Sequence, residues 1–163
     1  MTLMCWTRIL GDTGDVQSGI EKGASWQSGE YNLLQVYTGG VLLQMFDLPD
    51  ECDDDYSGGN GVDDAWHHIA GSWDGDHIRV YIDATEVAGG PCSGVLGTNE
   101  EPLYIGARGG ASRWTNGYYD EIKVFNRGLS QAEIEAAMAF ETVPAVDPLS
   151  SAAALWATLK SAP

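Results

Sequence analysis

Basic side chains are scarce in this chain, whose 163 residues include eight Lys and Arg residues against 24 Asp and Glu residues. The formal net charge is −16, and a field of that sign repels phosphate backbones, so we do not expect nucleic acid as a partner. The same excess attracts divalent cations, and hard carboxylate oxygens suit calcium better than softer metals. The alternative interpretation is an acidic surface that only keeps the protein soluble.

Long apolar runs are also missing, so we do not expect membrane insertion. The segment from Leu3 to Leu10 is hydrophobic, but it carries Arg8, alternates like a strand and lacks the basic start of a signal peptide. If the protein is exported, its signal lies outside this chain. With 44% hydrophobic residues, a chain of this length can bury one core and is too short for two ordinary domains.

Cysteine is rare, and three cysteines cannot all pair. Cys52 and Cys92 lie in loops rich in Gly and Asp, whereas Cys5 lies within the first predicted strand. The preferred interpretation is a Cys52–Cys92 disulfide with a buried free thiol at Cys5, which implies an oxidising compartment. Spacing alone does not fix connectivity, so three reduced thiols in a cytosolic protein remain the alternative.

Alternation of apolar and polar residues with a period of two runs through most of the chain and predicts short β-strands. The loops between them are rich in Gly, Asp, Ser and Asn, and such a series of strands and hairpin turns is typical of a sandwich or jelly roll. Only Gln131 to Phe140 is predicted to be helical, with Ser130 as its N-cap. The predicted strands are Leu3–Ile9, Ser18–Lys22, Tyr31–Tyr37, Val41–Phe46, His67–Trp73, His77–Asp83, Leu103–Gly106 and Tyr118–Asn126.

Two segments carry a family signature. Residues 66–83 read WHHIAGSWDGDHIRVYID, two alternating strands joined by the turn pair Asp74 and Gly75. Residues 117–135 read GYYDEIKVFNRGLSQAEIE, a strand that ends at a turn and leads into the capped helix. Together these segments resemble the laminin G-like jelly-roll domains of the concanavalin A-like lectin and glucanase superfamily, and the resemblance extends from Met1 to Met138.

The resemblance implies an all-β jelly-roll sandwich of two antiparallel sheets with one short C-terminal helix. We expect this domain over residues 1–140, followed by a linker and tail over residues 141–163 that resembles the terminal tags of some bacterial exported proteins. The implied function is a non-catalytic extracellular recognition module that binds carbohydrate and holds a structural calcium ion. The alternative is an adhesion or assembly module that binds another protein and no sugar.

Catalytic carboxylates are not found in the arrangement of the related glucanases, in which an acid and a nucleophile alternate on one strand and point into the same cleft. Asp120 and Glu121 are neighbours on a strand and therefore point to opposite faces. Glu133 and Glu135 are two residues apart on the predicted helix, where they also diverge. No Ser lies in a Gly-x-Ser-x-Gly motif, so the sequence predicts no enzymatic activity.

Aromatic and planar polar side chains in loops are the candidates for ligand contacts. Proteins hold sugars with a flat aromatic ring under the apolar face of the sugar and with polar groups on its hydroxyls. We interpret Trp6, Trp66 and Trp73 as core residues because they lie on predicted strands, and packing at the rim is the alternative for the loop tryptophans. The candidate ligand-binding residues are Trp26, Tyr31, Arg108, Arg113, Trp114 and Tyr118.

Two acidic groups are candidate calcium sites. Asp120 is predicted to share a strand face with Ile122 and Val124, where an unpaired carboxylate is costly, and the resemblance implies that the matching Asp holds a structural calcium. The second group matches positions one, three, five, six and twelve of an EF-hand-like loop, with a solvated acidic loop as the alternative. Its residues are Asp53, Asp55, Ser57, Gly58 and Asp64.

The start of the chain lacks a strand and loop that usually precede the matching segment TLMCWTRI in the family. The resemblance also places the first and last strands side by side, so we expect an open edge on Tyr118–Asn126 whose backbone groups need partners. Two partners are predicted: a second copy of the chain, giving a homodimer, or the tail around Leu155 and Trp156.

Overall fold

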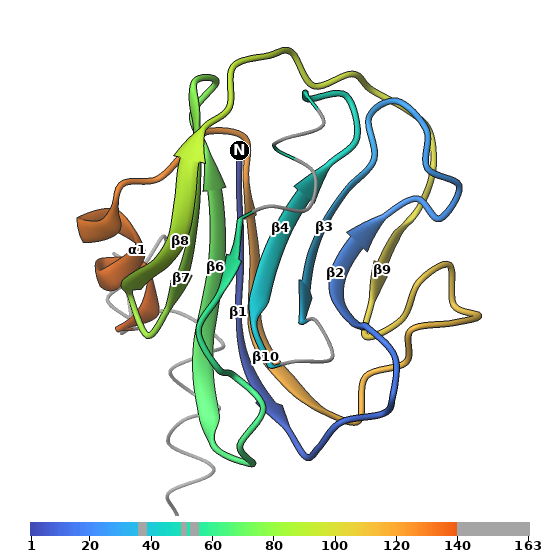
Figure 1. The fold of residues 1–163 in the computed structure, drawn as a ribbon, viewed down its shortest axis with the longest axis vertical. Helices are drawn as coiled ribbons and strands as arrows, with labels where there is room; N and C mark the ends of the chain where they lie inside the picture. The colour runs from blue at the N-terminus through green and yellow to red at the C-terminus, as the bar shows by residue number, and fades with distance from the viewer. Residues whose placement is uncertain (36–38, 50–51, 53–55, 140–163) are drawn as a thin grey trace, which may run out of the picture.

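Figure 1 shows the fold in a computed structural model, which describes residues 1–35, 39–49, 52 and 56–139. Two antiparallel five-stranded sheets face each other, and one helix follows the last strand, so the prediction of a jelly-roll sandwich is confirmed. The predicted tail, with Leu155 and Trp156, lies outside the described residues. The elements are β1 Thr2–Ile9, β2 Gln17–Lys22, β3 Tyr31–Gln35, β4 Val41–Met45, β5 Ser57–Gly58, β6 Trp66–Trp73, β7 His77–Ile82, β8 Thr85–Pro91, β9 Leu103–Ile105, β10 Gly117–Phe125 and α1 Gln131–Met138.

The strand order is β10-β1-β6-β7-β8 in one sheet, here called sheet A, and β5-β4-β3-β2-β9 in the other, here called sheet B. All eight predicted strands are present, and β10 pairs with β1 at the edge of sheet A, as expected. Two strands were not predicted. β5 has only two residues, and β8 contains Gly89, Gly90 and Pro91, which weaken a strand signal.

The main core lies between the two sheets and follows from the alternation of each strand. Leu3 and Cys5 of β1 meet inward-facing residues of sheet B, and Ile78, Val80 and Ile82 of β7 face the same core. Burial raises the pKa of the Cys5 thiol to about 12, so this thiol stays protonated.

A disulfide joins Cys52 and Cys92 at the margin of this core, with their Cα atoms 5.7 Å apart. The predicted pairing is therefore confirmed, and Cys5 is the free, buried thiol.

A second, smaller core lies on the outer face of sheet A, where α1 packs over part of the sheet. Ile134 of α1 is fully buried there against Met4, Ala70 and Tyr81. The face of β7 that carries Tyr81 is therefore partly covered by the helix. Ser130 caps α1 as predicted, because its side chain accepts from the Glu133 amide while the Glu133 side chain accepts from the Ser130 amide.

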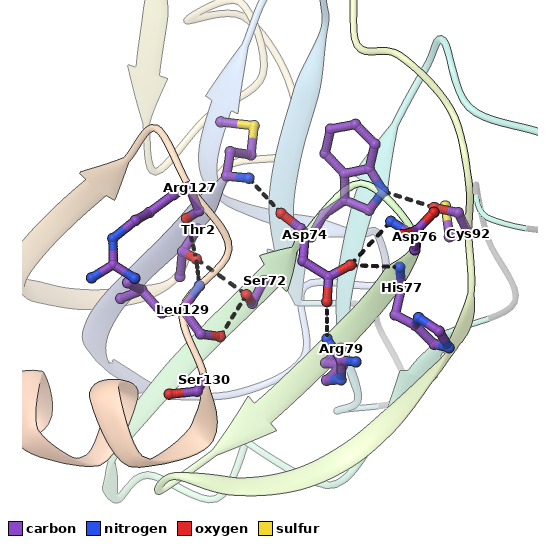
Figure 2. Close-up of polar contacts among 12 residues, drawn as sticks. Thr2, Ser72, Asp74, Asp76, His77, Arg79, Cys92, Arg127, Leu129 and Ser130 are labelled. Atoms are coloured by element: carbon purple, nitrogen blue, oxygen red, sulfur yellow. Dashed lines mark hydrogen bonds and ion pairs between the residues drawn. The ribbon is translucent and has the colours of Figure 1, made fainter.

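Hydrogen bonds fix the connection between β10 and α1 against sheet A (Figure 2). The Thr2 hydroxyl donates to the Arg127 carbonyl at 2.9 Å and accepts from the Leu129 amide at 2.9 Å. The Ser72 hydroxyl donates to the Leu129 carbonyl at 2.9 Å, so β1 and β6 both hold the segment that leads into the helix.

A β-bulge divides β10 into two halves with opposite phase. Glu121 has a positive φ of 49°, and the register with β1 shifts so that Asp120 pairs with Trp6 whereas Val124 pairs with Leu3. Trp6 and Leu3 lie on opposite faces of β1, so the prediction that Asp120 shares a face with Val124 was wrong. Asp120 is exposed on the outer face of sheet A, and its carboxylate accepts the Glu121 amide at 2.8 Å.

Candidate functional site

A row of polar side chains crosses the outer face of sheet B. Glu21, Asn32 and Gln44 are register partners on β2, β3 and β4, and the residues adjacent to them in each strand face the core. All three are almost completely buried, although they point away from the core between the sheets. Polar groups are seldom buried without a compensating role. We call these three residues the polar row.

Arg108 reaches the polar row from the loop that follows β9. Its Nε lies 3.4 Å from Glu21 Oε1 and 3.4 Å from the Ala24 carbonyl oxygen, and only 6% of the residue is exposed. Burial lowers the pKa of the Arg108 guanidinium and raises the pKa of the Glu21 carboxyl, while each charge favours the ionised form of the other. The Ser18 hydroxyl donates to Glu21 Oε2 at 2.6 Å.

Hydrogen-bonding capacity is left over in this group. Nη1 and Nη2 of Arg108 and both polar side-chain atoms of Asn32 are buried and have no hydrogen-bond partner among the residues that the structure describes. A buried donor without an acceptor costs about 1–3 kcal/mol, and more when the donor is charged. This cost is borne beneath Trp26, where the buried guanidinium lies against the indole.

Trp26 lies over Arg108 and is the exposed part of the site. Its ring centroid is 3.9 Å from Arg108 Cζ and 5.2 Å from Arg113 Cζ, and the indole packs edge-on against Phe46 at 4.6 Å. About half of Trp26 remains exposed, at 52%. An aromatic face beside two guanidinium groups is an arrangement suited to a sugar ring, which needs an apolar platform and polar groups at its edge.

The backbone at Trp26 is strained, with φ at 60°, and one buried carboxylate holds it in place. Glu30 Oε1 accepts the amides of Ala24 and Ser25 at 3.1 and 2.9 Å, and its Oε2 accepts the Trp26 amide at 2.8 Å. A side chain at Gly23 would overlap Glu30, since a Cβ there would lie 2.3 Å from Oε1. Glu30 therefore positions Trp26, and no pattern in the sequence indicated this role.

The loop that carries Arg108 and Arg113 is tied to β2. The Ser18 amide donates to the Arg113 carbonyl at 3.0 Å, and the Thr115 hydroxyl donates to the Ser18 carbonyl at 2.8 Å. Arg113 itself has a positive φ of 50°. Both arginines are thus held over sheet B by backbone contacts to the strand that contributes Glu21.

The predicted ligand-binding residues do not all meet at this site. Trp26, Arg108 and Arg113 come together over sheet B, and Trp114 is exposed in the same loop. Tyr31 instead packs against the core between the sheets. The sixth candidate, Tyr118, lies on the outer face of sheet A, on β10.

The sequence did not single out the polar row or Glu30, which lies just before β3. The alternation of QSGIEK in β2 and YNLLQ in β3 placed Glu21 and Asn32 opposite the core, but it could not show that this face is covered.

An open pocket of about 480 Å³ lies on the outer face of sheet A, beside the start of α1. Three of its charged groups already have partners: Arg79 donates to Asp74 at 2.8 Å, as Figure 2 shows, and Glu133 pairs with Arg127 at 2.8 Å. The Arg79 hydrogen bond holds the pKa of the Asp74 carboxyl well below its usual range. Because these three groups are already paired, the pocket is a weaker candidate than the site on sheet B.

The candidate calcium ligands do not gather in the described part of the chain. No group of three His, Cys, Asp or Glu residues within the described part of the chain is arranged to hold a metal ion. Asp64, a predicted ligand, instead binds Arg8 through Nη2 at 2.7 Å. Ser57 and Gly58 form β5, and Asp53 and Asp55 lie outside the described residues, so calcium in that loop stays a prediction.

The family model described as the concanavalin A-like lectin/glucanases superfamily matches residues 1–135 of this chain. A search of the curated proteins gave no match. No helix in the described part of the chain is long and apolar enough to cross a membrane.

Solved structures of sugar-binding proteins share the fold. The CBM40 domain of the Ruminococcus gnavus IT-sialidase, also solved with α2,3-sialyllactose, is 14% identical with a TM-score of 0.63; the match covers 83% of this chain and 80% of that domain. Domain 4 of an extracellular GH43 arabinanase from Geobacillus stearothermophilus, solved with arabinotriose, is 15% identical with a TM-score of 0.56. The match covers 83% of this chain and 65% of that chain.

A candidate carbohydrate-binding protein from Bacteroides ovatus is 17% identical, with a TM-score of 0.60; the match covers 92% of this chain. The chain spans only 43% of the length of that protein. At these identities the likeness shows the fold.

Proposed function

Because the chain belongs to the concanavalin A-like lectin/glucanase superfamily, we propose that it is a non-catalytic carbohydrate-binding module that acts outside the cell. Domains of the same fold that bind sialyllactose and arabinotriose support a glycan as the partner. The Cys52–Cys92 disulfide supports an oxidising, extracellular compartment.

The observation that carries the proposal is the buried Arg108 guanidinium beneath the half-exposed Trp26 ring. The positive charge of Arg108 lies against one face of the indole, and Arg113, which is only half-buried, is the donor at the edge of the ring that sugar hydroxyls can reach. A sugar ring stacks on the exposed part of Trp26, its hydroxyls accept from Arg113 at the margin, and Arg108, which Glu21 holds in position, supports the indole from below. Glu30 keeps Trp26 in its strained conformation, so the platform exists before the ligand arrives.

A printed saccharide array tests the site directly. We expect the wild-type protein to bind a subset of the saccharides, and Trp26→Ala to weaken that binding by about tenfold or more, since stacking and desolvation are both lost. Trp114→Ala is the matched control, because it removes an exposed tryptophan from the neighbouring loop and is expected to have a smaller effect. Loss of binding in Trp114→Ala with none in Trp26→Ala would place the site elsewhere. A silent array together with specific capture of a purified protein would favour the adhesion module instead.

Calcium is a separate part of the proposal and rests on the acidic loop that contains Asp53 and Asp55. If this loop binds calcium, the protein should melt at a higher temperature in millimolar calcium than in chelator. Magnesium at the same concentration should raise the melting temperature much less. Identical melting curves would remove calcium from the proposal without affecting the sugar site.

A further inference from the structure

Three aromatic side chains lie together on the outer face of sheet A, far along the strands from α1. Arg8 of β1 is the register partner of both Trp66 on β6 and Tyr118 on β10, so these residues form one row on this face. Trp6 lies in the next row, between His68 and Asp120. Trp66 and Tyr118 are 45% and 56% exposed, and their ring centroids are 6.5 Å apart. We call Trp6, Trp66 and Tyr118 the aromatic patch.

The prediction that Trp6 and Trp66 are core residues was wrong, because both lie on the outer face of sheet A and the helix covers only part of this face. Tyr81 and Met4 are buried under α1, and the Lys123 ammonium donates to the Ala137 carbonyl at 2.9 Å near the end of the helix. Asp120 and Trp6 form the row beyond Lys123 and Met4, and the aromatic patch therefore starts where the helical cover ends.

Fixed neighbours support the aromatic patch. Two contacts hold the Arg8 guanidinium on Asp64 Oδ1, from Nε at 2.8 Å and from Nη2 at 2.7 Å. Trp6 packs edge-on against His68 at 5.6 Å. Desolvation lowers the pKa of His68 to about 4, so this buried imidazole is neutral at physiological pH and does not charge the underside of the aromatic patch.

From this arrangement we propose that the aromatic patch is a second saccharide-binding surface, separate from the site on sheet B. Exposed tryptophan and tyrosine rings on rigid strands offer an apolar platform, and Arg8, Asp64 and Asp120 at its margin offer hydrogen bonds to hydroxyls. The two carboxylates outnumber the one guanidinium, and the chain carries a net charge of −16, so this surface takes neutral rather than acidic saccharides.

The two surfaces lie on opposite outer faces of the sandwich. Stacked sheets are about 10 Å apart, so two saccharide chains bound on the two faces would be bridged by one protein molecule. A multivalent neutral polysaccharide would then be cross-linked, which a module with one site cannot do as a monomer.

The test compares five proteins on one array of neutral and acidic saccharides: wild type, Trp26→Ala, Tyr118→Ala, Tyr118→Phe and the double variant Trp66→Ala with Tyr118→Ala. We expect some neutral saccharides to bind Trp26→Ala as they bind the wild type. The same saccharides should bind Tyr118→Ala and the double variant, here called the patch variants, about tenfold more weakly. Tyr118→Phe is the matched control, because it keeps the ring and should keep the binding. Near-ultraviolet circular dichroism checks that each variant is folded, and Tyr118→Ala, at an exposed position, serves if the double variant fails to fold.

The outcomes separate this proposal from the proposed function. If the patch variants match the wild type, the second surface is overturned, and the first stands when Trp26→Ala loses binding. If only the patch variants lose binding, the second surface stands and the site on sheet B falls. A wild-type array without binding overturns both. A dimer in sedimentation that becomes a monomer in the patch variants, with unchanged array binding, would assign the aromatic patch to a second copy of the chain.

Discussion

Replacing Glu30 with Gln tests whether one buried carboxylate organises the sugar site on sheet B. The carboxylate accepts three backbone hydrogen bonds, from the amides of residues 24–26. Gln has nearly the same shape but only one acceptor oxygen, so its amide nitrogen must face at least one of these donors. The substitution removes the charge and opposes one or two N–H groups with another donor.

Each hydrogen bond to a charged group contributes roughly 1.5–3 kcal/mol, so the free energy of unfolding should fall by about 2–3 kcal/mol. Saccharide binding should weaken as well. Trp26 has a φ of 60°, which is unfavourable for a bulky residue, and without the hydrogen bond to the Glu30 carboxylate its backbone should relax to another conformation. Relaxation of the Trp26 loop would separate the indole from Arg108, and we expect saccharide affinity to fall by about tenfold.

Urea unfolding and the saccharide array measure the two effects on the same variants. Glu100→Gln is the matched control, because it makes the same chemical change at an exposed position. If Glu30→Gln unfolds at the same urea concentration as Glu100→Gln and keeps its affinity, Glu30 does not position Trp26 and the preorganised platform is refuted.

Three further predictions concern the scaffold. The Cys52–Cys92 bridge spans a sequence separation of 40, for which the chain-entropy relation gives a stabilisation of about 4 kcal/mol. Replacing both cysteines with Ser should lower the free energy of unfolding by that order in a urea titration. An unchanged urea midpoint would contradict this prediction. Ser130→Ala removes the cap of α1 and should cost about 1 kcal/mol in the same assay, whereas Ser130→Asp should restore most of it. Burial alone would lower the pKa of His67, but hydrogen bonds to two carboxylates outweigh it and raise the pKa. The stabilisation is therefore complete below the unfolded pKa of about 6.5 and is lost as pH rises through the higher folded pKa. In urea titrations from pH 6 to 8, the free energy of unfolding of His67→Gln should fall less with pH than that of the wild type. Parallel curves for the two proteins would count against this role of His67.

The parts of the fold that the sequence predicted are those set by local signals. The β6–β7 hairpin follows from alternation and from the Asp74 turn, and α1 follows from Ser130 and Glu133, which are only three residues apart. The bulge at Glu121 was not predictable in this way. A positive φ at a Glu residue has no sequence signal. The bulge allows Tyr119 to pack against the core between the sheets and Phe125 to pack against the smaller core under α1.

The candidate site was predicted by residue type and not by position. Trp26 and the two arginines were singled out for their chemistry, but their meeting depends on how the loop after β9 folds back onto β2. Trp66 was assigned to the core because most strand tryptophans are buried. Its exposure depends on the short length of α1, which ends at Met138 before it covers that row of sheet A.

The extra residue in β10 constrains how this strand can change in length. Tyr119, before the bulge, packs into the core between the sheets, whereas Phe125, after it, packs beneath the helix. Deleting one residue at the bulge would restore an uninterrupted ladder with β1 and would leave the downstream pairs, Lys123 with Met4 and Phe125 with Thr2, unchanged. Deleting a second residue would put the rest of the strand out of phase with β1 and turn Phe125 toward the wrong layer. A related chain that is one residue shorter in this segment is therefore compatible with the same fold, and an alignment should place that single gap at residue 121 or 122.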